Sequence, residues 1–143
     1  MAIVFNNNND KFKLKKSALI KKWIEKVAAK EKRSVGDLSY VFMSDEELLK
    51  INQQFLKHNT YTDIITFDYS ENKKISGEIF ISVDRVEENA KKMGTTFEDE
   101  IHRVIIHGVL HLCGYKDKTK IDSDNMRKQE DKALRVFYVL TNE

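Results

Sequence analysis

The chain has 143 residues, of which 41% are hydrophobic and 34% charged, and its formal net charge is +2. We expect a single domain spanning residues 1–143, because a chain of this length buries its own core and is too apolar to be disordered. No apolar run approaches the roughly 18 residues that span a bilayer, which excludes a transmembrane protein. The single cysteine, Cys113, excludes an internal disulfide and a cysteine-rich zinc site.

The N-terminal part of the chain is basic. Ile3–Phe5 predicts a short strand, and Lys16–Arg33 predicts an amphipathic helix with lysines on its polar face. Residues 1–37 contain ten Lys and Arg against four Asp and Glu, whereas residues 38–100 contain seven against thirteen. This balance indicates either a polyanion-binding surface or a solvated helix face without a partner. The candidate polyanion ligands are three lysines: Lys15, Lys22 and Lys26. A secretory signal would place its charges before a longer apolar stretch, so we expect a cytoplasmic protein.

The middle of the chain alternates strands and helices. Gly and Asp at residues 36–37 end the basic helix, and the aromatic and β-branched residues of Leu38–Met43 predict a strand. A capping box at residues 44–47 opens a helix that reaches about Gln54, and a loop follows at residues 55–61.

The second half of the chain predicts a hairpin followed by three helices. Thr62–Asp68 and Ile75–Ser82 are the two strands of the hairpin. The helices are expected over Val83–Met93, from Thr95 or Thr96 to Cys113, and over Ser123–Leu140. This order predicts a mixed α/β (α+β) fold in which a single sheet of about four strands packs against helices.

His107 and His111 are four residues apart on the predicted helix that ends at Gly114. Four residues complete about one turn, so both rings leave the same face with Cβ atoms roughly 6 Å apart, a spacing that suits one tetrahedral zinc ion. Gly114 lets the chain turn back, so that Asp117 can reach the same ion. Two histidines and one aspartate leave one coordination position open, which is typical of a catalytic zinc. We therefore expect one zinc per chain, held by these three residues.

The helix around these histidines also permits simpler explanations. Each ring could hydrogen-bond a core carbonyl without binding a metal. A glycine such as Gly108 within a helix costs about 1 kcal/mol of stability relative to alanine. Its presence indicates that a neighbouring backbone or a substrate comes close to the helix at this point, or simply that the helix packs against a strand there. His102 lies on a different face from His107, and we expect it at the surface.

The stretch His107-Gly-Val-Leu-His111-Leu-Cys-Gly114-Tyr115 resembles most of the HGxLHLxGYDH signature of the YbeY-type endoribonucleases, a family of rRNA maturation factors. Three further segments are similar to family patterns in collinear order, over roughly residues 38–140. They are Asn52 with Thr62–Phe67, the strand start Gly77–Ile79, and Met126 with Glu130 in the last helix.

This resemblance implies a zinc-dependent, single-strand-specific endoribonuclease that acts in rRNA maturation at the 3′ end of 16S rRNA and in ribosome quality control. The implied partners are single-stranded RNA and the small ribosomal subunit in the cytoplasm, with the oligomeric state left open.

The sequence departs from the family pattern at two positions. The third histidine of the signature is replaced by Asp117, and carboxylate is an acceptable zinc ligand. The family arginine that the resemblance marks as important for activity is Leu56 here. Lys57 and His58 follow directly and are candidates for the missing cation, the alternative being that both are exposed loop residues.

Two other classes of function stay open. A metallopeptidase of the HExxH type needs a glutamate where this chain has Gly108. A non-catalytic ribosome assembly factor that keeps its zinc for structure fits the loss of the arginine. For a nuclease, Glu78 and Glu100 are equal candidates for the general base.

Overall fold

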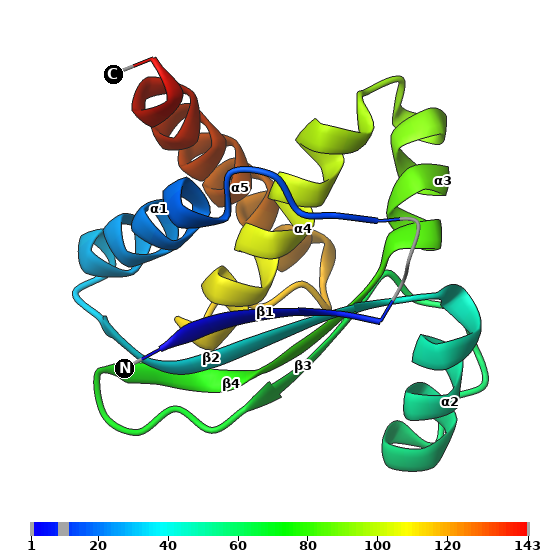
Figure 1. Cartoon of the computed structure of the whole chain (residues 1–143). Helices are drawn as coiled ribbons and strands as arrows, with labels where there is room; N and C mark the ends of the chain where they lie inside the picture. Colours follow the sequence, from blue (N-terminus) through cyan, green and yellow to red (C-terminus); the bar gives the residue numbers. More distant parts are fainter. Residues whose placement is uncertain (1, 9–11, 143) are drawn as a thin grey trace.

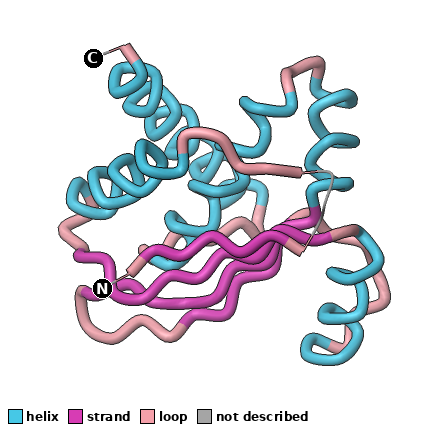
Figure 2. Tube along the Cα trace, in the orientation of Figure 1, coloured by secondary structure: helices cyan, strands magenta, loops and turns pink. Residues whose placement is uncertain are grey.

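A single four-stranded sheet forms the base of the molecule, and most of the helices cover one of its faces (Figure 1). The computed structural model describes residues 2–8 and 12–142. Figure 2 shows the strands as one continuous layer with helices above it and loops at both ends. The predicted α+β fold is therefore confirmed.

The sheet has the strand order β1-β2-β4-β3. Its members are β1 (Ile3–Asn7), β2 (Ser34–Met43), β4 (Lys74–Ser82) and β3 (Ile64–Asp68). β1 pairs in parallel with β2, and β2 in parallel with β4, while β3 and β4 are antiparallel. The predicted hairpin is confirmed by this last pairing, which places β3 at the edge of the sheet.

Five helices complete the fold: α1 (Ser17–Lys30), α2 (Asp45–Leu56), α3 (Val83–Met93), α4 (Phe97–Leu112) and α5 (Lys120–Thr141). In Figure 1, α1, α3, α4 and α5 lie on the same side of the sheet, with α5 beside both α1 and α4. None of the described helices is long and apolar enough to cross a membrane.

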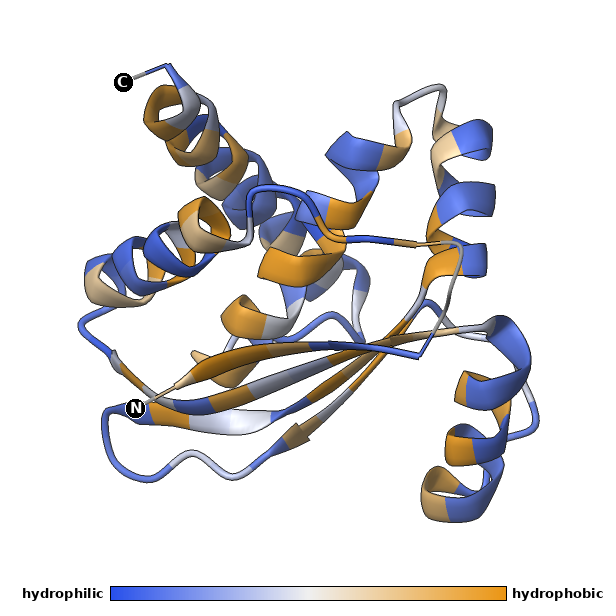
Figure 3. Ribbon diagram, viewed as in Figure 1, coloured by the Kyte–Doolittle hydropathy of each residue, from blue (hydrophilic) through white to orange (hydrophobic). Residues whose placement is uncertain are grey.

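The main core lies between the sheet and the helices above it. Alternate residues of β2, among them Tyr40 and Phe42, are buried against these helices, and α4 is hydrophobic through its middle (Figure 3). The Tyr40 hydroxyl donates a hydrogen bond to the Ile105 carbonyl at 3.0 Å, and the Trp23 indole N–H donates to the Ala133 carbonyl at 2.7 Å. These two bonds tie α4 to the sheet and α5 to α1.

α2 packs against the opposite face of the sheet. Leu48 of this helix forms a smaller core with Met43 and Ile65. The predicted capping box begins the helix, because the Ser44 hydroxyl accepts a hydrogen bond from the Glu47 N–H at 3.2 Å. This arrangement places the end of α2 and the loop after it beside β3.

Several element boundaries differ from the sequence prediction. α1 ends at Lys30, so the expectation that residues 36–37 end it is wrong, because these residues belong to β2. β2 begins at Ser34, because it continues to pair with β4 across an irregularity between Val35 and Leu38. Gly36 lies within this irregular part of the strand, where an added Cβ would come within 2.3 Å of the Ser76 hydroxyl oxygen. α5 begins at Lys120 rather than Ser123, because Thr119 caps it.

Candidate metal centre

The C-terminal half of α4 carries the two histidines of the predicted zinc site. Thr96 begins this helix, since its hydroxyl accepts a hydrogen bond from the Asp99 N–H at 3.1 Å. The rings of His107 and His111 are nearly parallel, at 9°, and their centroids are 6.4 Å apart. The two imidazoles therefore leave the same face of the helix, as their spacing predicts.

A tight turn after α4 brings an aspartate back to these rings. Gly114 adopts a left-handed conformation, with φ of 106°, and the Tyr115 N–H reaches back to the Leu110 carbonyl at 3.1 Å. Such a C-terminal turn favours glycine, because a side chain is strained at positive φ. The chain then reverses, and Asp117 Oδ2 lies 3.2 Å from His107 Nε2.

Gly108 lets α4 lie close to the sheet between the two histidines. An added Cβ would come within 2.9 Å of Ile79 Cδ1 and 3.3 Å of Ile64 Cδ1. Of the explanations that the sequence left open, the structure favours packing against a strand. The glycine thereby holds the histidine face of the helix close to β3 and β4.

Glu130 of α5 holds His107 from the side opposite Asp117. Its Oε2 lies 2.6 Å from His107 Nδ1, and its Oε1 accepts a hydrogen bond from Arg103 at 2.9 Å. Arg103 also donates to Asp131 at 2.7 Å. A buried carboxylate on Nδ1 keeps the proton there and leaves Nε2 free to face a ligand. The sequence analysis assigned no role to this network, although Glu130 falls on the apolar stripe with Met126 and Leu134, where a buried acid needs a partner.

The surroundings of the histidines are acidic. Burial lowers the pKa of His107, but the hydrogen bond to Glu130 and the charges of nearby carboxylates outweigh it, so the net shift is upward. Burial raises the pKa of Asp63 and of Glu100 in the same region. The site therefore favours a positively charged occupant.

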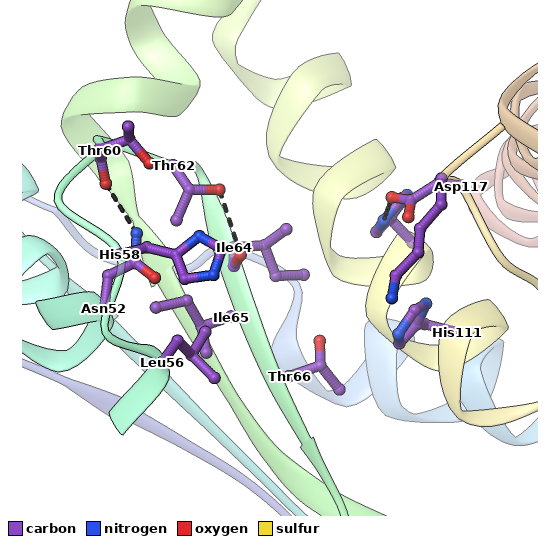
Figure 4. Close-up of a pocket in the computed structure, with 12 residues that line it drawn as sticks. Asn52, Leu56, His58, Thr60, Thr62, Ile64, Ile65, Thr66, His111 and Asp117 are labelled. Carbon is purple, nitrogen blue, oxygen red and sulfur yellow. Dashed lines mark hydrogen bonds and ion pairs between the residues drawn. The ribbon is translucent and has the colours of Figure 1, made fainter. Parts of the chain in front are cut away.

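His107, His111 and Asp117 line one open cavity of about 350 Å³, between α4, β3 and the loop after α2 (Figure 4). Asn52 supports this loop by donating a hydrogen bond to the Thr60 carbonyl at 2.7 Å. Leu56, where the sequence resemblance implies an arginine, is part of the cavity wall.

The cations near this cavity differ from the pair that the sequence suggested. His58 lines the cavity, but Lys57 is not among its lining residues. Lys57 caps α2 in a left-handed conformation and is exposed. Lys118, to which the sequence analysis assigned no role, lines the cavity beside Asp117 because it follows the same turn at Gly114.

The three lysines expected to bind a polyanion lie elsewhere. Lys15, Lys22 and Lys26 are exposed, and none lines the histidine cavity. Lys15 is 3.9 Å from Glu98, whereas Lys26 lines a groove between α1 and α5 with Lys30, Lys132 and Arg135. A role in RNA binding would therefore act at a distance from the histidines.

The structure also places His102 and the two candidates for the general base, Glu78 and Glu100. The expectation that His102 lies at the surface is wrong: it is only 9% exposed, and its ring packs 4.4 Å from Phe137 and 6.2 Å from Trp23. Glu78 accepts a hydrogen bond from the Tyr69 hydroxyl. It alternates with Ile79, which faces α4, so Glu78 points away from the histidines, whereas Glu100 lines a cavity with His107.

The three donors are of the kinds that zinc prefers, and all three line one cavity. His111 Nδ1 is buried and has no hydrogen-bond partner in the described chain, so the ring can turn toward a ligand without breaking a bond. Within residues 2–8 and 12–142, no three His, Cys, Asp or Glu side chains already converge as a metal cage. Binding would therefore require a side-chain rotation, which the unpaired His111 ring permits.

The chain is similar over nearly all its length to known proteins. The family model described as Endoribonuclease YbeY matches residues 3–138. A protein named endoribonuclease YbeY from Cytophaga hutchinsonii is 51% identical over 133 residues, which cover 92% of this chain and 93% of the relative. One from Flavobacterium psychrophilum is 46% identical over 140 residues, which cover 98% and 99%.

A solved structure has the same fold. The solution structure of TM1509 from Thermotoga maritima aligns with a TM-score of 0.66 and 30% sequence identity, covering 96% of this chain and 89% of that one. By the match of the family model and of these relatives over nearly all its length, the chain belongs to the endoribonuclease YbeY family.

Proposed function

We propose that the chain is a zinc-dependent endoribonuclease that cleaves single-stranded RNA, with residues 1–143 as its one catalytic domain. The observation that carries the proposal is the shared cavity of His107, His111 and Asp117, in a chain whose relatives are named endoribonucleases. Its substrate would be the 3′ end of 16S rRNA in the small ribosomal subunit, within the cytoplasm. The protein would serve rRNA maturation and ribosome quality control.

One zinc per chain would be held by His107, His111 and Asp117. A bound zinc ion polarises a phosphoryl oxygen and makes a water molecule nucleophilic near neutral pH. Glu130 holds the His107 ring by its Nδ1 proton, so that Nε2 stays available. Of the two candidates for the general base, Glu78 is disfavoured, because its carboxylate binds Tyr69.

The open cavity suits an extended RNA strand, because the edge strand β3 forms one wall and the loop after α2 another. His58 and Lys118 would stabilise the charge of the reacting phosphate. Neither offers the bidentate fork of an arginine, so we expect slower cleavage than an arginine at position 56 would support.

The second candidate function is a non-catalytic ribosome assembly factor, favoured by the apolar Leu56 in the cavity wall. A metallopeptidase of the HExxH type is disfavoured, because Gly108 packs against the sheet and supplies no general base.

The metal and the activity are tested together by zinc analysis and cleavage of a labelled single-stranded RNA. The purified protein should hold one zinc, and His107→Ala/His111→Ala should lose both metal and cleavage. Asp117→Ala should weaken zinc binding, whereas Asp117→His should retain it. Full zinc occupancy in the double variant would exclude this site. Zinc binding without any RNA cleavage would favour the assembly factor.

The source of the missing cation is tested by single-turnover cleavage, with metal content verified for each variant. If a side chain near the cavity replaces the arginine, then His58→Ala or Lys118→Ala should slow cleavage by about 100-fold, the typical effect of losing a charge-stabilising donor. Lys57→Ala tests the other candidate from the sequence. Leu56→Arg should restore the rate of the slowed variant. If none of the alanine variants is slower and Leu56→Arg alone creates activity, the natural protein is not an efficient nuclease.

A further inference from the structure

A second cavity, of about 280 Å³, adjoins the histidine cavity. His107 and Asp117 line both cavities, and so do Thr62, just before β3, and Ile64, at the start of β3. The candidate metal centre thus lies at the boundary between two neighbouring spaces. A strand of RNA cleaved at this boundary would place one nucleotide on each side.

Some polar groups of the second cavity are already engaged within the protein. Glu130 binds His107 at 2.6 Å and Arg103 at 2.9 Å, and Arg103 also binds Asp131. These groups form a structural network that supports the histidine. They are therefore not available to a ligand.

Of the other carboxylates along the wall, Glu100 lacks such a partner, whereas Asp117 contacts His107. Glu100 is only 9% exposed and lines the cavity, and no hydrogen bond or ion pair engages its carboxylate within the described chain. The Asp63 carboxylate lies 3.4 Å from the Asn89 side-chain nitrogen and interacts electrostatically with His107. A carboxylate that the fold leaves without a donor at a cavity wall is free to accept hydrogen bonds from a ligand in that cavity.

The charge of the cavity narrows the ligand class. Carboxylates outnumber cations along its wall, so a phosphate would be repelled from its interior. A neutral group that offers N–H donors is favoured. Since the inference rests on RNA being the substrate, the N–H donors are those of a nucleobase.

Guanine matches these acceptors best. Its Watson–Crick edge presents a ring N–H and an amino group side by side, and one carboxylate can accept from both. Adenine and cytosine each place an amino group beside a ring acceptor, and uracil places its N–H between two carbonyls. A single carboxylate can therefore make the paired contact with guanine alone.

We propose that this cavity is a guanine subsite beside the cleaved phosphate. Glu100 accepts hydrogen bonds from the guanine edge, and Asp63 provides a second acceptor. Arg127 lines the same cavity, is exposed and has no ion pair in the described chain, so it suits a flanking phosphate.

The first test measures binding of the four ribonucleoside 5′-monophosphates to the full-length protein by equilibrium dialysis. Guanosine monophosphate should bind at least about tenfold more tightly than the others, the discrimination expected of one bidentate pair. Glu100→Gln should abolish this preference, since an amide presents a donor where one acceptor stood. Arg127→Gln should weaken all four nucleotides alike, because a phosphate contact carries no base information.

Glu98→Gln is the matched control, because Glu98 lies on the same turn of α4 and its side chain is 64% exposed. It should leave the guanine preference unchanged. Glu100→Gln should fold as well as the natural protein, since it breaks no hydrogen bond, and urea unfolding verifies this. Equal binding of the four nucleotides, or a preference that survives Glu100→Gln, would overturn the guanine subsite.

The second test maps cleavage sites in a randomised single-stranded RNA. Guanine should be enriched at one position next to the cut, and Glu100→Gln should remove the enrichment while Glu98→Gln keeps it.

If the protein cleaves without enrichment, the subsite is wrong and the nuclease function stands. If guanosine monophosphate binds selectively but no RNA is cleaved, the subsite stands and the nuclease function is wrong. If Glu100→Gln only removes a bound Mg²⁺ ion, without any base preference in the natural protein, a cation site replaces the guanine subsite.

Discussion

Replacing Glu130 with glutamine tests how the fold holds the histidine site. Glutamine has nearly the same shape and can still accept a hydrogen bond from Arg103. It removes the negative charge that Glu130 shares between His107, at 2.6 Å, and Arg103, at 2.9 Å. The change therefore weakens two charge-assisted contacts without creating a cavity.

The size of the expected loss of stability depends on how deeply Glu130 is buried and on whether Arg103 keeps another partner. The Glu130 side chain is 8% exposed, and a hydrogen bond to a charged group contributes about 1.5–3 kcal/mol in such surroundings. Arg103 keeps Asp131 at 2.7 Å, so the loss stays below the roughly 3–5 kcal/mol of a buried charge left alone. We expect the free energy of unfolding of the metal-free protein to fall by about 2–3 kcal/mol. Zinc should bind roughly 10- to 100-fold more weakly, as when other carboxylates behind histidine ligands are removed.

The pH dependence of this loss has a definite sign. His107 has a pKa raised above its ordinary value of 6.5, so its stabilising contribution is fully present below that value. It disappears as the pH rises through the raised pKa. The difference between natural protein and Glu130→Gln, both metal-free, should therefore be larger in mildly acidic than in alkaline buffer.

Urea denaturation of chelator-treated protein and competition with a chromophoric zinc chelator measure the two effects. Asp131→Asn is the control, because the Asp131 side chain is 46% exposed and contacts Arg103 alone within this network. It should cost no more than about 1 kcal/mol and leave zinc affinity unchanged. The positioning role of Glu130 would be refuted if the two variants lost equal stability and Glu130→Gln bound zinc as tightly as the natural protein does.

Three further predictions concern the packing around the site. Gly77→Ala should lower the free energy of unfolding by about 3 kcal/mol in urea titrations. The added Cβ would clash with the Phe67 carbonyl oxygen, which belongs to the backbone of a paired strand and cannot move freely. A variant as stable as the natural protein would contradict this prediction. Trp23→Phe should cost about 1–2 kcal/mol by the same assay, since it leaves the buried Ala133 carbonyl without the 2.7 Å indole bond that joins α1 to α5. Burial lowers the pKa of His102, so its protonation favours the unfolded chain and stability is lost as the pH falls below 6.5. The stability of His102→Phe relative to the natural protein should consequently rise with acidity, and a pH-independent difference would exclude this linkage.

The elements that the sequence predicted well are those with local signals. The capping box at Ser44 and the hairpin strands depend on residues near one another in the chain, so their patterns are visible without a fold. The shared face of His107 and His111 follows from helical spacing alone. The extension of β2 back to Ser34 could not be predicted, because it depends on pairing with Lys74, forty residues away in the chain.

Residues of the candidate site that the sequence analysis missed or misplaced depend on packing between distant elements. Glu130 meets His107 only because α5 packs along α4. His102 is buried because α1 and α5 bring Trp23 and Phe137 against it. The sequence by itself determined which donors share a helix face, since that is set by helical periodicity. The tertiary structure decided which buried charges neutralise one another, because such pairing requires contact between segments that are remote along the chain.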